Sequence, residues 1–127
     1  MRIIKPTAVV IALLSGLLMS TLAQAHPKLL TSTPVEGAEG APPDKIELHF
    51  SENLVTQFSG AKLLMTEMAG MAHAPIPVKA KVSGGSDPKT MLITPTTPLT
   101  AGTYKVEWRA VSSDTHPITG NVTFKVK

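Results

Sequence analysis

The sequence has 127 residues, with twelve basic and nine acidic side chains, four histidines and no cysteine. The absence of cysteine excludes disulfides, thiolate metal sites and copper centres of the blue type, which need a cysteine ligand. No basic run is interleaved with aromatic residues, so the composition argues against a nucleic-acid-binding protein.

Residues 1–25 have the pattern of a secretory signal peptide. Two basic residues precede an apolar run over residues 8–19, and residues 23–25 form a small-x-small cleavage site. The apolar run is short for a membrane-spanning helix, which needs about 20 residues. We therefore expect cleavage of residues 1–25, export, and one mature domain of residues 26–127, in which ten basic residues face nine acidic ones.

Cleavage after Ala25 would make His26 the first residue of the mature chain. The freed α-amine and the imidazole Nδ1 of one residue can chelate one metal ion, because the amine loses its proton readily beside a metal. The alternative is that a histidine occurs here by chance. The residue by itself does not decide between the two.

Short stretches of alternating apolar and polar residues follow, separated by segments rich in glycine and proline. Ile46–Phe50 alternates cleanly, with His49 expected as a solvated strand residue and Glu52 as a turn or capping residue just beyond it. Thr103–Val111 is the longest stretch and places Trp108 at the centre of the core. This pattern, without a convincing helix, predicts an all-β Greek-key sandwich or barrel. About seven strands are expected, at residues 28–32, 46–50, 61–66, 78–82, 91–94, 103–111 and 122–126.

Three methionines at a spacing of three residues, Met65, Met68 and Met71, are followed closely by His73. Thioether sulfur and imidazole suit Cu(I), so their crowding indicates a copper site. The same spacing also fits one face of a buried helix. However, Gly70 and two following prolines oppose a helix, and the intervening alanines add little apolar surface. We therefore predict a methionine-rich loop at the end of a strand.

Asp114 and His116 lie two residues apart, just before Pro117, which favours an extended backbone. Their side chains would then project to the same side of the chain. Alone this pair is a weak signal, because an aspartate turn beside a surface histidine is common. Together with His26, it would supply an amine, two imidazoles and a carboxylate, a ligand set that suits Cu(II).

Several motifs occur together across the mature chain. They are Ala-His-Pro at residues 25–27, Phe-Ser-Glu-Asn at 50–53, Phe-Ser-Gly-Ala-Lys at 58–62, the methionine segment, and Trp-Arg-Ala-Val-Ser-Ser-Asp-Thr-His-Pro-Ile-Thr-Gly at 108–120. In these motifs the chain resembles the CopC family of exported bacterial copper-resistance proteins. The resemblance implies a cupredoxin-like, immunoglobulin-type β-barrel in the periplasm that binds copper and passes it on. Partners implied in the same way are an inner-membrane copper importer of the CopD type or other periplasmic copper proteins.

The resemblance also implies two copper sites, one for each oxidation state. The Cu(II) ligands would be His26, through its amine and Nδ1, with Asp114 and His116. The Cu(I) ligands would be Met65, Met68, Met71 and His73. Relatives with this methionine segment often carry a further methionine where this chain has Ile76.

These observations favour a copper-binding carrier or buffer in copper resistance and homeostasis, without catalytic turnover. The main alternative is a copper-dependent oxidative enzyme, because an N-terminal histidine with a second histidine can also bind copper for oxygen activation. Against the enzyme, Asp114 would fill a coordination position, and one tryptophan and one tyrosine offer little substrate surface. A metal-free adhesion or chaperone module of the cell envelope is the third possibility.

Overall fold

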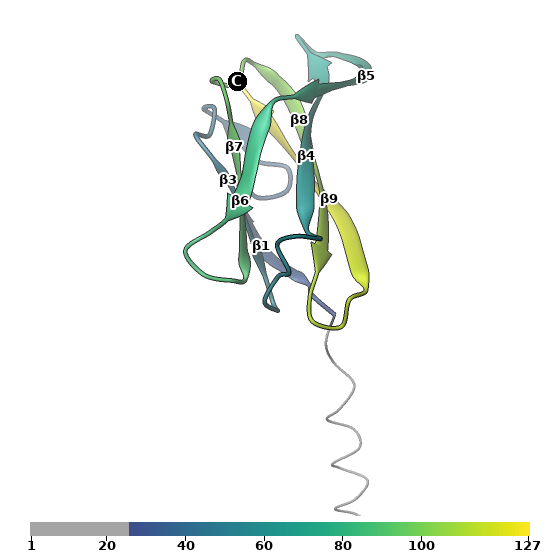
Figure 1. Ribbon diagram of the computed structural model, residues 1–127. Helices are drawn as coiled ribbons and strands as arrows, with labels where there is room; N and C mark the ends of the chain where they lie inside the picture. The colour runs from purple at the N-terminus through teal and green to yellow at the C-terminus, as the bar shows by residue number, and fades with distance from the viewer. Residues whose placement is uncertain (1–25) are drawn as a thin grey trace, which may run out of the picture.

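Two β-sheets packed face to face make up the protein over residues 26–127, the part that the computed structural model describes (Figure 1). The expected signal peptide, residues 1–25, lies outside the described residues. Within residues 26–127, no helix has the length and hydropathy needed to cross a membrane. The prediction of an all-β sandwich is confirmed.

The first sheet has four antiparallel strands in the spatial order β1-β3-β7-β6. Their bounds are β1 (Leu29–Thr33), β3 (Ile46–Phe50), β7 (Thr90–Pro95) and β6 (Ala80–Gly84). The second sheet has five strands in the order β2-β9-β8-β4-β5, in which only the short β2 pairs in parallel. Their bounds are β2 (Glu39–Gly40), β9 (Pro117–Val126), β8 (Gly102–Val111), β4 (Gly60–Met68) and β5 (Met71–Val78).

The hydrophobic core lies between the sheets, because alternate residues of each strand point to the same face. In β3, Ile46, Leu48 and Phe50 are buried, whereas Glu47 and His49 lie on the outer face. The core cluster is Ile46, Leu48, Phe50, Leu63, Met65, Met91, Ile93, Leu99, Tyr104, Val106, Trp108, Ala110, Val122, Phe124 and Val126.

Trp108 belongs to this core, as the alternation in β8 predicts. Its indole meets the ring of Phe50 edge to face, with centroids 5.1 Å apart and planes at 73°, an arrangement that contributes about 1 kcal/mol beyond area burial. Its six-membered ring lies against Gly120 of β9, where an added β-carbon would collide with it. The contact with Phe50 joins the two sheets, and the contact with Gly120 lets β8 and β9 approach closely near the connection between them.

A second aromatic pair supports the other end of β8. Tyr104 stacks on Phe124 with centroids 5.6 Å apart, and its hydroxyl donates a hydrogen bond of 2.6 Å to the carbonyl of Thr100. A buried tyrosine bonded back to the preceding connection is typical of immunoglobulin-like sandwiches. This bond lets the phenol lie in the core with its polar atom satisfied.

The methionine segment is a β-hairpin, so the prediction of a loop is wrong. Strands β4 and β5 pair antiparallel with Met68 opposite Met71, and Ala69 and Gly70 between them have φ of 52° and 75°. Positive φ at both central residues is the conformation of the tight turns that join two-stranded hairpins. The prolines of β5 did not prevent a strand because β5 is at the edge of its sheet, where a missing N–H is tolerated.

Other strand boundaries also differ from those expected. The structure has nine strands over the described residues instead of about seven. The last strand begins at Pro117 and not near Val122, because it pairs along its full length with β8. The tip of the β4–β5 hairpin and the β8–β9 connection lie at opposite ends of the sandwich (Figure 1).

Candidate metal centres

The first candidate site lies where the start of the described chain meets the β8–β9 connection. Pro27 is buried, and Lys28 and Ser51 exchange two hydrogen bonds of 2.9 Å, from Lys28 N to Ser51 Oγ and from Ser51 N to the Lys28 carbonyl. These contacts anchor the residue after Pro27 to the end of β3. They therefore hold His26 over the β8–β9 connection.

The other two residues of this site are Asp114 and His116, within the tight connection between β8 and β9. Thr115 between them has φ of 66°, and its N–H donates a 3.0 Å hydrogen bond to the Ser112 carbonyl. This turn brings the Asp114 carboxylate back over the backbone of His116, whose N–H donates to Asp114 Oδ1 at 3.2 Å. A tight turn, and not an extended chain as the sequence suggested, makes the two side chains converge.

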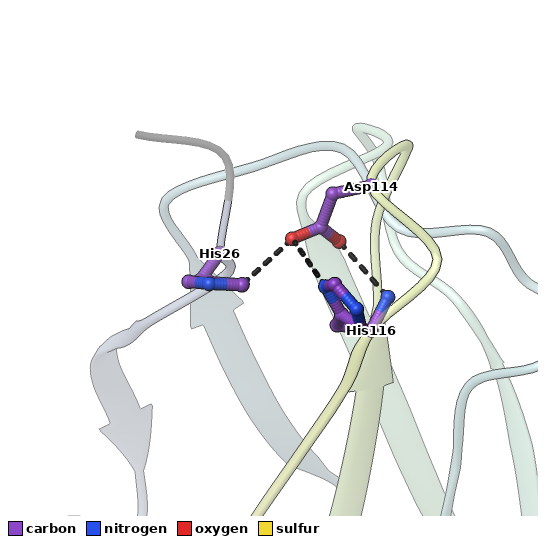
Figure 2. Close-up of side chains that lie close together, drawn as sticks. All are labelled: His26, Asp114 and His116. Atoms are coloured by element: carbon purple, nitrogen blue, oxygen red, sulfur yellow. Dashed lines mark hydrogen bonds and ion pairs between the residues drawn. The ribbon is translucent and has the colours of Figure 1, made fainter. Parts of the chain in front are cut away.

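Figure 2 shows the three side chains converging on the Asp114 carboxylate. His26 Nδ1 lies 2.6 Å and His116 Nδ1 3.8 Å from Asp114 Oδ2. Potential ligand atoms of all three residues lie within 4.8 Å of one another, and no other group of three or more such residues occurs among residues 26–127. Glu52 is therefore not part of this cluster.

The environment of Asp114 keeps it ionised. Desolvation raises the pKa of its carboxyl, but hydrogen bonds from the His116 N–H and the Ser112 hydroxyl, with positive charge on His26 and His116, lower that pKa by more. The net pKa of Asp114 lies below its ordinary value. The site therefore offers a carboxylate, and not a carboxylic acid, at neutral pH.

The second oxygen of this carboxylate, Oδ2, faces the two imidazoles. Ser112 and the His116 N–H both donate to Oδ1, whereas Oδ2 is buried and accepts no hydrogen bond from the described residues, although His26 Nδ1 is close to it. The side chains of His26 and His116 are 59% and 73% exposed, so an ion can reach the site from solvent. A carboxylate oxygen beside two imidazoles fits a transition-metal ion, which would replace the contact between His26 Nδ1 and Oδ2.

The second candidate site is the β4–β5 hairpin. Met68 and Met71 face each other across the strands, and their side chains are 50% and 73% exposed. Met65 differs: it is 7% exposed and belongs to the hydrophobic core. The structure thus presents two of the three thioethers to solvent and keeps the third between the sheets.

His73 lies on β5, two residues beyond Met71, so the pleat of the strand points both side chains to the same side. Its Nδ1 is 2.8 Å from the carbonyl of Ala74, and since a carbonyl only accepts, Nδ1 carries the proton. Nε2 is then an acceptor, and it is buried without a hydrogen-bond partner among residues 26–127. That free nitrogen is suited to bind a metal ion. Ile76, opposite Met65, is half exposed.

Sequence reasoning missed the residues that hold the first site in place. Ser51 fixes the segment after His26, and Ser112 occupies one oxygen of the Asp114 carboxylate. Serine is common in turns whatever its role, so the sequence gave no indication of these contacts.

Comparison with known proteins identifies the family. Residues 29–127 match the family model described as the CopC domain. The chain belongs to the CopC family. Two relatives are both called copper resistance protein C. That of Pseudomonas syringae pv. tomato is 75% identical over 121 residues, covering 95% of this chain and 96% of the relative. That of Escherichia coli is 60% identical over 118 residues, which cover 91% of this chain and 94% of the relative.

Solved structures of other CopC-family proteins share the fold. The crystal structure of PcoC from Escherichia coli, described as a methionine-rich copper resistance protein, matches with a TM-score of 0.76 and 62% sequence identity, covering 81% of this chain and all of that one. CopC from Methylosinus trichosporium OB3b matches with a TM-score of 0.67 and 25% sequence identity, and the match covers 80% of this chain and 94% of that one. The CopC-family match begins just after the His26 segment, whereas Asp114 and His116 lie within it.

Proposed function

We propose that this CopC-family protein is a copper-binding carrier or buffer in copper resistance, which holds and transfers copper without catalytic turnover. The observation that carries the proposal is the cluster of His26, Asp114 and His116, whose ligand atoms lie within 4.8 Å of one another. Relatives 75% and 60% identical over nearly the whole chain are named copper resistance proteins, which supports the same role here.

At the first site the ion would be Cu(II). Two imidazoles and an ionised carboxylate are nitrogen and oxygen ligands, and among divalent first-row metals such sites bind Cu(II) most strongly. Removal of residues 1–25 would add the α-amine of His26 as a fourth ligand and would leave residues 26–127 as the mature domain. The exposure of both histidines leaves room for a partner to approach and take the ion.

At the hairpin the ion would be Cu(I). Met68, Met71 and His73 supply two thioethers and one imidazole nitrogen, a soft set that suits Cu(I). Met65 remains a predicted ligand from the sequence, but it would have to leave the core to reach an ion at the hairpin tip. We therefore assign the main Cu(I) role to the two exposed methionines and His73.

The compartment and partners follow from the same proposal. A signal peptide at residues 1–25 would direct the protein to the periplasm, where copper would be exchanged with an inner-membrane importer of the CopD type or with other periplasmic copper proteins. Two sites at opposite ends of the sandwich would let one partner contact the Cu(II) end while the hairpin remains accessible (Figure 1).

The test is to produce the chain starting at His26 and a variant with one alanine added before it. The added residue converts the His26 amine into an amide, which should weaken Cu(II) binding about 100-fold or more and leave Cu(I) binding unchanged. Affinities are measured by competition with a chelator specific for each oxidation state. Equal Cu(II) affinity of the two proteins would exclude the amine as a ligand, and no Cu(II) binding by either would refute the proposal. Sustained copper-dependent oxidation of added substrates by the loaded protein would favour an enzyme instead.

A further inference from the structure

A second polar cluster lies on the outer face of the four-stranded sheet, where β3 and β7 run side by side (Figure 1). His49 of β3 is paired in register with Thr90 of β7, and its Nδ1 is 3.0 Å from Thr90 Oγ1. The Thr90 hydroxyl in turn donates to Asp87 Oδ1 at 3.1 Å. The connected groups therefore form a chain from carboxylate to hydroxyl to imidazole.

This chain determines which nitrogen of His49 carries the proton. The hydroxyl of Thr90 has one hydrogen, and the Asp87 carboxylate only accepts, so that hydrogen goes to Asp87. Thr90 Oγ1 must then accept from His49, which places a proton on Nδ1. The Lys89 N–H also donates a 2.7 Å hydrogen bond to Asp87, which holds its carboxylate in this orientation.

The other nitrogen of His49, Nε2, is left with a lone pair and lies near the carboxylate of Glu47. Nε2 lies 3.9 Å from Glu47 Oε2. When the imidazole is neutral, His49 Nε2 and Glu47 Oε2 are both acceptors, and this arrangement favours a cation between them. Lys45 does not fill the position, because its Nζ lies 3.9 Å from the other oxygen, Oε1. The side chains of His49 and Glu47 are 39% and 32% exposed, so an ion can enter from solvent.

We propose that His49 Nε2 and Glu47 Oε2 form an additional, weaker site for a divalent cation of borderline softness, such as Zn(II) or Cu(II), completed by water. An ion at about 2.0 to 2.2 Å from an imidazole nitrogen and a carboxylate oxygen can bridge these two atoms once the partly exposed side chains of His49 and Glu47 move slightly closer than 3.9 Å. Thr90 and Asp87 act as positioning residues, because metal-binding histidines commonly donate their other N–H to a fixed partner. Two protein ligands make this site weaker than the one at His26.

The experiment is a Zn(II) titration of the ¹⁵N-labelled protein, followed in long-range ¹H–¹⁵N spectra that resolve each of the four histidines. We expect the Nε2 signal of His49 to shift, at higher Zn(II) than is needed for His26 and His116. In Glu47→Gln the midpoint of the His49 shift should move to about tenfold higher Zn(II). In Lys45→Ala it should move to roughly twofold lower Zn(II), since a competing cation has been removed.

Thr90→Val tests the positioning role at nearly constant volume. It should release the Nδ1 proton from its fixed position and weaken Zn(II) binding at His49, while the signals of His26 and His116 respond as before. Unchanged backbone spectra establish that each variant is folded. A His49 signal that does not respond to Zn(II), or one that responds equally in Glu47→Gln, would overturn the proposal. Such a result would leave the copper sites untouched, because they share no residue with this cluster.

Discussion

The two candidate copper sites are built in opposite ways. His26 lies at the start of the described chain, whereas Asp114 and His116 lie in the β8–β9 connection, and the three meet only because the fold brings these segments together. Met68 and Met71 are neighbours across one tight turn, with His73 two residues along the same strand. The first site depends on the whole sandwich, whereas the second depends on one edge hairpin.

The sites also differ in how much of their geometry exists without a metal. Asp114 holds both histidines near one oxygen while its other oxygen is occupied by two hydrogen bonds. At the hairpin, the two exposed methionines have flexible thioether side chains with no such restraint. A pre-organised nitrogen and oxygen site at one end and an adaptable sulfur site at the other would let each bind its ion independently. The following changes test that independence.

The largest effect is expected from Asp114→Ala, which removes the shared partner of both histidines. Cu(II) affinity should fall about 100-fold or more, while Cu(I) affinity stays the same, as measured by separate competition titrations. Asp44→Ala removes an exposed carboxylate elsewhere and should change neither. If Asp114→Ala weakened both oxidation states equally, the two sites would not be separate.

At the hairpin, Met68→Leu combined with Met71→Leu should lower Cu(I) affinity about tenfold or more. The free energy of unfolding should change by no more than about 0.5 kcal/mol, because both side chains are exposed. Met65→Leu is the matched control: it preserves core volume and should retain Cu(I) affinity. An equal Cu(I) loss in Met65→Leu would mean that Met65 leaves the core to bind, as the sequence alone suggested.

A smaller effect is expected from Gly70→Ala, which acts on the hairpin backbone without removing a ligand. The φ of 75° at Gly70 disfavours a β-carbon, so the change should cost about 1 kcal/mol of stability in urea unfolding. Cu(I) binding should weaken and Cu(II) binding should not. Gly84→Ala is the control, because Gly84 has open space for a β-carbon and no positive φ. Equal destabilisation by the two variants would contradict the assigned turn strain.

The smallest effect concerns the metal-free protein in acid. The pKa of Asp114 in the folded state lies below its ordinary value of 3.8, which the unfolded chain has, so its carboxylate stabilises the fold above that pH. This contribution is fully present at neutral pH and is lost as pH falls through the lower, folded pKa. Urea unfolding at pH 7 and pH 3 should show that the free energy of unfolding falls slightly more between these pH values in the original protein than in Asp114→Asn. Identical pH profiles would show that the carboxylate is not stabilised in the fold.

Much of this architecture could be predicted from the sequence, because the alternation of side chains in residues 46–50 and 103–111 reflects a two-layer fold in which one strand face is buried. The same alternation placed Trp108 in the core. The ligand types proposed for both candidate sites also come from the sequence, since they depend on residue type, and they remain predictions. The CopC-family match and the two-sheet structure confirm the family and the fold class.

Only the tertiary structure decided which methionines are exposed and how the nitrogen and oxygen ligands converge. Met65 is in the core and Met68 is not because β4 continues past the sandwich into an edge hairpin, a position in which the prolines of β5 are also tolerated. The distances around Asp114 depend on the turn at Thr115 and on the anchoring of Lys28 by Ser51. Apart from the local turn at Thr115, contacts between residues distant in sequence produce these features, so local residue patterns do not reveal them.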